Sequence, residues 1–168
     1  MALFKVNTCC RDREVCNLRW DWEIPLPQLG TSVFLVPGSL VKNVDERLIV
    51  LNQVARSVID AQRGTHPTHV FHFRGKPVGH MLNSAWKLAR ARAGLPQVRV
   101  HDLKHTFGRR LRAAGVSFED RQDLLGHRSG RITTHYSAAE LTNLIEAAEK
   151  VCDRGNGRPE LVVLRRLN

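Results

Sequence analysis

The stretch VHDLKHTFGRRLRAAGVSFEDRQDLLGHRSGRITTHYS, residues 100–137, decides how this sequence of 168 residues is interpreted. It holds four of the eight histidines and the only tyrosine, Tyr136. A lone tyrosine in a domain of this size is usually buried for packing, but Tyr136 follows the polar sequence ITTH and two short helical patterns that carry histidines. This setting favours an exposed tyrosine. The function therefore depends on whether Tyr136 is a nucleophile.

Apolar residues recur at helical spacing within this stretch and in the segments around it. Leu103, Phe107 and Leu111 share one face, and Ser117 is a good N-cap for the helix that follows. The segments predicted as helices are 53–64, 84–93, 101–114, 117–125 and 138–151, and residues 2–19 are predicted as helical segments with Thr8 as an N-cap.

Residues 20–52 differ in character. The sequences WDWEIPLP, TSVFLV and RLIVLN are apolar or β-branched and are separated by Pro, Gly and Asn. They predict three short antiparallel strands with turns at 27–31 and 41–46. Lys42 lies in the second turn, where its side chain either reaches away from the sheet toward a site or is simply solvated. Residues 66–77 are predicted to be irregular, and residues 153–168 to be a loop and an extended C-terminal tail.

Composition favours one soluble domain, residues 1–168. The chain is 42% hydrophobic and long enough to bury a core without disulfides. No apolar run approaches the roughly 18 residues of a membrane span, and no signal peptide opens the chain, so we expect an intracellular, cytoplasmic protein. The four cysteines, Cys9, Cys10, Cys16 and Cys152, lack CxxC spacing and are predicted to be small reduced hydrophobes rather than metal or redox groups.

The charge balance favours a polyanionic partner. Lys and Arg total 26 against 16 acidic residues, which gives a net charge of +10 and a pI near 10.3. Nucleic acid comes first among such partners and an anionic membrane second, with a merely basic surface as the alternative.

Several kinds of chemistry find no support in the motifs. His101 and His105 stand four apart, as zincin ligands do, but HEXXH is absent and the spacing indicates no third ligand. Neither a Gly-rich phosphate loop nor a GxSxG elbow is present. No metal site and no cofactor is therefore predicted.

The basic groups together with Tyr136 fit phosphodiester chemistry better. A phenol has a pKa of about 10 and is a weak nucleophile unless cations stabilise its anion. The same cations can neutralise the charge that develops on a phosphate under attack. Arg11 and Glu14 share a helix face, where Glu14 either fixes the guanidinium or forms an ordinary surface ion pair. Spacing alone does not show that Arg11, Lys42, His101, Lys104 and His127 converge on Tyr136.

The 100–137 stretch resembles the C-terminal motif of tyrosine recombinases, the phage integrase family. In that family a His-x-x-Arg pair opens a helix, Leu-Gly-His follows, and the nucleophilic tyrosine comes shortly after. His101, His127 and Tyr136 match the two histidines and the tyrosine.

Two upstream segments extend the resemblance. TCCRDREVCNLRW is similar to the family's Thr-Gly-x-Arg-x-x-Glu-x-x-x-Leu-x-Trp helix, which assigns Arg11 and Glu14. LVKNVDERLIVLN is similar to the hairpin that carries the family's lysine, which assigns Lys42. Two positions depart from the pattern: Lys104 stands at the second arginine, and Cys9 at a glycine, where we expect it to tighten the start of a helix. Lysine keeps the charge but loses the planar fork that grips two oxygens.

The resemblance implies a mainly α fold with a small three-stranded antiparallel β-sheet, that of a tyrosine-recombinase catalytic domain without the family's N-terminal DNA-clamping domain. It implies that Tyr136 attacks a DNA phosphate to form a 3′-phosphotyrosyl link. Arg11 and Lys104 would bind the non-bridging oxygens with help from His127, and Lys42 would protonate the leaving 5′-oxygen. His101 would take or position the tyrosine proton, and Glu14 would hold Arg11. No ATP, metal or cofactor is required.

The implied partner is double-stranded DNA at a specific site, bound by a homotetramer during integration or excision of a phage or mobile element. The candidate backbone contacts are basic residues on two predicted helices: Arg90, Arg92, Arg109, Arg110 and Arg112. The apolar stripe Leu141, Leu144 and Ile145 either docks on a neighbouring protomer or packs on its own domain. Two alternatives stay open: a weakened relative that binds DNA without cleaving it, and an enzyme like a type IB topoisomerase.

Overall fold

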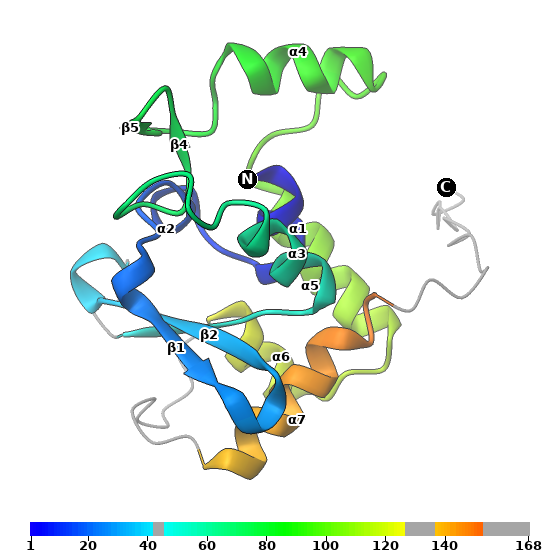
Figure 1. The fold of residues 1–168 in the computed structure, drawn as a ribbon. Helices are drawn as coiled ribbons and strands as arrows, with labels where there is room; N and C mark the ends of the chain where they lie inside the picture. Colours follow the sequence, from blue (N-terminus) through cyan, green and yellow to red (C-terminus); the bar gives the residue numbers. More distant parts are fainter. Residues whose placement is uncertain (42–45, 127–136, 153–168) are drawn as a thin grey trace, which may run out of the picture.

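The computed structural model of the protein describes residues 1–41, 46–126 and 137–152, and within these ranges the chain forms seven α-helices and two antiparallel sheets (Figure 1). The helices are α1 (Ala2–Thr8), α2 (Asp12–Cys16), α3 (Gln53–Asp60), α4 (Ser84–Arg92), α5 (Asp102–Ala113), α6 (Phe118–Leu125) and α7 (Ala138–Glu149). The strands are β1 (Glu23–Leu26), β2 (Thr31–Val36), β3 (Arg47–Val50), β4 (His72–Phe73) and β5 (Lys76–Pro77). The predicted mainly α fold with a small three-stranded antiparallel sheet is confirmed for this part of the chain.

The three-stranded sheet has the order β1-β2-β3, with Phe34 opposite Glu23 on one side and Ile49 on the other. β2 is the central strand, and its Val33, Phe34 and Val36 are buried. The first connection is a short 3-10 turn at Pro27–Leu29 that closes on Gly30 at φ 58, a conformation that glycine adopts without strain.

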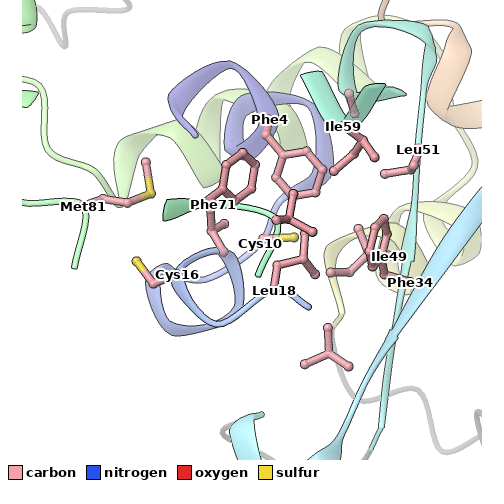
Figure 2. Close-up of a cluster of buried hydrophobic side chains, with 14 of the residues drawn as sticks. Phe4, Cys10, Cys16, Leu18, Phe34, Ile49, Leu51, Ile59, Phe71 and Met81 are labelled. Carbon is pink, nitrogen blue, oxygen red and sulfur yellow. The ribbon is translucent and has the colours of Figure 1, made fainter. Parts of the chain in front are cut away.

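One hydrophobic cluster fills the space between the sheet and the N-terminal helices (Figure 2). The rings of Phe4 from α1 and Phe71 meet edge to face at 5.4 Å between centroids, and Phe34 and Ile49 reach the cluster from the sheet. α1 packs against both α3 and α5, and these two helices fix the position of the segment that leads into Arg11.

A second cluster joins α5, α6 and α7 to β3. Phe107 and Leu111 of α5 are buried there, as their spacing predicts, together with Leu124 of α6 and Leu144 of α7. Ile145 packs at the edge of this cluster, so Leu144 and Ile145 of the stripe on α7 pack on their own domain.

Three local expectations from the sequence were wrong. Thr8 is the last residue of α1, not an N-cap, because its hydroxyl donates to the Phe4 carbonyl inside that helix. Arg11 is the N-cap of α2. Trp20–Trp22 forms a 3-10 turn instead of the start of a strand, and residues 66–77 contain the short β4–β5 hairpin. The predicted tail, residues 153–168, lies outside the described residues.

Three of the four cysteines are buried, as expected for small hydrophobic side chains. Cys9, Cys10 and Cys16 are buried and all four thiols are free. Burial raises the pKa of the Cys10 thiol to about 12 and that of Cys16 to about 11, which keeps both neutral and unreactive at physiological pH.

Candidate active site

Arg11 is held by a buried carboxylate. Its Nη1 donates to Glu14 Oε1 at 3.0 Å, and its backbone N–H donates to Glu14 Oε2 at 2.7 Å. Glu14 is fully buried, whereas 27% of the Arg11 side chain is exposed. The pair is therefore not an ordinary surface ion pair: the carboxylate fixes the first turn of α2 and leaves one side of the guanidinium open to a ligand.

A second guanidinium, that of Arg47 in β3, binds the same carboxylate. Its Nη1 lies 2.8 Å from Glu14 Oε2, and its Nη2 donates to the Cys9 carbonyl at 3.2 Å. Only 3% of the Arg47 side chain is exposed. Arg11, Glu14 and Arg47 thus form one network with a net positive charge, in which Glu14 and Arg47 are buried and Arg11 is partly exposed.

The turn between α1 and α2 is strained at Cys9. This residue ends α1 in the left-handed conformation, at φ 59, so it does not tighten the start of a helix as expected from the sequence. A non-glycine residue in this conformation costs about 1–2 kcal/mol. Two buried cations hold the turn: Arg47 on the Cys9 carbonyl, and Lys5, whose Nζ donates to the Cys10 carbonyl at 2.6 Å.

Lys104 approaches the same turn from α5. Its side chain is buried, and its Nζ donates to the carbonyl of Leu125 at 3.3 Å. The Cys9 Sγ lies 3.9 Å from the Lys104 carbonyl, which brings α5 against the turn before Arg11. Burial lowers the pKa of the Lys104 ammonium, and the nearby charges of Arg47 and Arg11 lower it further. Lys104 and Arg11, far apart in sequence, are therefore electrostatic neighbours.

His101 stands next to this group at the start of α5. It is exposed, and its ring meets that of His105 at 4.7 Å between centroids and 83° between planes. Partial burial lowers the pKa of His101, and the charges of His105, Lys5 and Lys104 act in the same direction. Its ring is therefore mainly neutral at pH 7, the form that can accept a proton.

Four of the predicted catalytic and supporting residues are thus described, and the structure brings Arg11, Glu14, Lys104 and His101 to one region. The other three, Lys42, His127 and Tyr136, lie outside the described residues. Their sequence neighbours are described: Leu125, which binds Lys104, stands two residues before His127, and Ser137 is the N-cap of α7 directly after Tyr136.

The candidate DNA-binding arginines differ in their surroundings. Arg90 donates to the carbonyl of Val98, and Arg110 to that of Val151, so both tie their own helices to neighbouring segments. Arg92, Arg109 and Arg112 are exposed. Figure 1 shows α4, which carries Arg90 and Arg92, set apart from the other helices.

Sequence reasoning missed Arg47 and Lys5. Both are buried cations: Lys5 binds the Cys10 carbonyl in the turn before Arg11, and Arg47 binds the Cys9 carbonyl in that turn and the Glu14 carboxylate in α2. The available signals were Arg47 at the start of the apolar strand RLIV and Lys5 inside the apolar helical segment ALFKV.

Neither a metal centre nor a membrane span is found in the described ranges. No cluster of three or more His, Cys, Asp or Glu side chains there has the arrangement of a metal site. No helix among residues 1–41, 46–126 and 137–152 is both long and apolar enough to cross a bilayer.

Comparison with known proteins identifies the family of the chain. Residues 1–142 match the phage integrase family, and the chain therefore belongs to that family. It is 28% identical over 161 residues to the integrase of Salmonella phage P22, an alignment that covers 88% of this chain and 41% of that integrase. The chain thus spans less than half the length of this relative.

Glu14→Ala is expected to destabilise the protein by about 3–5 kcal/mol, because it leaves the buried guanidinium of Arg47 without a counter-charge. Urea unfolding measures the free energy of unfolding. Asp60→Ala is the matched control: it breaks a surface pair with Arg63 and should cost less than about 1 kcal/mol. A Glu14→Ala protein as stable as this control would show that the carboxylate does not hold the network.

The ring of His101 is expected to titrate below the ordinary histidine pKa of about 6.5. The charged imidazolium is disfavoured by burial and by neighbouring cations, so protonation requires a lower pH. His105→Gln removes one of these charges and should move the midpoint upward. NMR titration of the His101 ring protons, assigned with His101→Gln, measures both values. A midpoint at or above 6.5, or one that His105→Gln leaves in place, contradicts the expected environment.

Proposed function

We propose that this chain is the catalytic domain of a tyrosine-type site-specific DNA recombinase, a phage or mobile-element integrase. The observation that carries the proposal is that Arg11, two residues after Cys9, and Lys104, whose carbonyl lies 3.9 Å from the Cys9 Sγ, are electrostatic neighbours at the Cys9 turn. The Arg11 guanidinium is open to a ligand on one face, and the Lys104 ammonium is a desolvated point charge. Two cations placed in this way can bind the non-bridging oxygens of a phosphodiester without a metal ion.

In the proposed reaction the phenolic oxygen of Tyr136 attacks the phosphorus atom of a DNA strand. The new bond joins the phosphate to the tyrosine as a 3′-phosphotyrosyl ester, and the bond to the 5′-oxygen breaks. His101, mainly neutral at pH 7, takes or positions the phenolic proton. Lys42 supplies a proton to the leaving 5′-oxygen, and His127 adds a hydrogen bond to the phosphate. The ester retains the energy of the broken bond, so rejoining by another 5′-hydroxyl needs no ATP.

Lys104 distinguishes this site from the family pattern. An ammonium offers one point charge where a guanidinium offers a two-pronged fork. Its fixed position compensates in part, because the bond to the Leu125 carbonyl and the burial of its stem hold Nζ beside the Cys9 turn. A desolvated charge acts more strongly on a phosphate than a solvated one does.

The surrounding assembly is part of the proposal. A net charge of +10 supplies non-specific attraction to the DNA backbone, and the exposed Arg92 and Arg109 are candidates for contacts that position the duplex. We propose that the chain acts as a homotetramer on double-stranded DNA at a specific site, in integration or excision.

A covalent-trapping experiment tests the proposed activity. The full chain is incubated with a pool of nicked duplexes of randomised sequence, in which the short strand next to the nick diffuses away after cleavage. Protein–DNA adducts that survive denaturation are recovered, and the enriched sequence is then built into recombination substrates. We expect adducts and recombinant products. Binding without adducts, for both the natural chain and Lys104→Arg, would identify a DNA-binding module; relaxation of supercoils without recombinants would identify a topoisomerase.

A further inference from the structure

We propose that Arg47 is a positioning residue of this site, one that sets the geometry of Arg11 and keeps the site positively charged. The inference depends on the proposed function for its chemistry and on the described residues for its geometry. Arg47 itself touches no reacting atom: it acts through Glu14, through the Cys9 turn and through Gly126.

The shape of the Arg47 guanidinium lets it bind two features at once. One arm donates to Glu14 Oε2 at 2.8 Å, and the other donates to the carbonyls of Cys9 at 3.2 Å and Thr8 at 3.4 Å. Glu14 in turn holds both the side chain and the backbone N–H of Arg11. A single planar group therefore fixes the carboxylate and the strained turn relative to each other, and these two features determine where the Arg11 guanidinium lies.

The Arg47 guanidinium also lies against Gly126, the residue that ends α6. A Cβ atom built on Gly126 would stand 2.9 Å from both Cζ and Nε of Arg47, and the residue has φ +61. The backbone at the end of α6 therefore approaches the guanidinium as closely as a glycine allows. Leu125 and Gly126 directly precede His127 in the sequence, and the Leu125 carbonyl binds Lys104. Arg47 is thus the common contact of the segments that carry Arg11 and precede His127.

Arg47 also changes the charge balance around Arg11. Glu14 alone would neutralise Arg11 and weaken its attraction for a phosphate. Because Arg47 shares the carboxylate, the three groups together keep one positive charge, and Lys104 adds another nearby. Stability alone gives little reason for this arrangement, since a buried ion pair can often be replaced by apolar side chains without loss. The Nε of Arg47 is also buried with no hydrogen-bond partner among the described residues.

The test compares Arg47→Lys, which keeps the charge but loses the fork, with Arg47→Met, which loses both. Arg63→Met is the matched control, because Arg63 is also ion-paired but lies on the surface against Glu23 and Asp60. Three quantities are measured in the full chain: the cleavage rate on a trapped duplex, the Kd for that duplex, and the order of the Arg11 Nε–H group by NMR in [15N]arginine-labelled protein.

Arg47→Lys is expected to slow cleavage by about 10- to 100-fold with Kd changed less than about twofold, and to make the Arg11 Nε–H group more mobile. Arg47→Met is expected to slow cleavage further. If Arg47→Met does not fold, the proposal is judged on the results for Arg47→Lys alone. The proposal is overturned if Arg47→Lys leaves both the cleavage rate and the order of Arg11 as in the Arg63→Met control. If the natural chain forms no adduct, the proposed function fails while the order of Arg11 still tests the role of Arg47.

Discussion

Tyr136→Phe is expected to abolish covalent attachment to DNA, with a loss of at least about 10⁴-fold in the rate of adduct formation. The substitution removes only the phenolic oxygen and keeps the ring, so the variant should bind the same duplex with a Kd within about twofold of the natural chain. Tyr136 is the only tyrosine in the sequence, and no second phenol can replace it.

The measurement is the rate of adduct formation on a nicked duplex, followed by gel electrophoresis under denaturing conditions. Phe118→Leu serves as a control, because Phe118 is 60% exposed and is not part of the site. Adduct formation by Tyr136→Phe at the natural rate would mean that another residue is the nucleophile, and the proposed reaction would have to be abandoned.

Lys104→Met is expected to slow cleavage by about 10²- to 10³-fold, the usual cost of losing one group that stabilises developing charge in a transition state. Methionine has nearly the length of lysine and suits a buried position. Because burial already lowers the pKa of Lys104, removing its charge should not destabilise the fold. The loss should therefore appear in the cleavage rate and not in the free energy of unfolding.

Lys150→Met provides the matched control, since Lys150 is exposed at the end of α7. Lys104→Arg should retain more activity than Lys104→Met, because it preserves the charge that faces the phosphate. If Lys104→Met cleaves as fast as the Lys150→Met control, then this lysine does not act as the second cation of the site.

Much of the fold could be predicted from the sequence because its signals are local. Val33, Phe34 and Val36 mark a buried strand, and Phe107 and Leu111 mark the buried face of α5. The error at Thr8 has a physical cause. A threonine before a helical pattern is a common N-cap, but here Glu14 caps the backbone N–H of Arg11 from the third position of α2.

The site was only partly predictable. The Arg11–Glu14 contact follows from their spacing of three residues, which a helix brings together. The role of Arg47 does not follow from any spacing, because its partners Glu14 and Cys9 come from another element and a turn. The left-handed conformation of Cys9 was missed for another reason: the family pattern has a glycine at this position, but the cysteine was expected to tighten a helix start instead of adopting the backbone that glycine favours.

The central claim is that Arg11 and Lys104 together neutralise the phosphate that Tyr136 attacks. It is tested most directly with a duplex in which the scissile phosphate is a methylphosphonate, where a methyl group replaces one non-bridging oxygen and the linkage carries no negative charge. Lys104→Met should then cleave at nearly the rate of the natural chain, within about fivefold, although it cleaves the ordinary phosphodiester about 10²- to 10³-fold more slowly. An equal loss on both duplexes would contradict the claim, because the lysine would then act on something other than the phosphate charge.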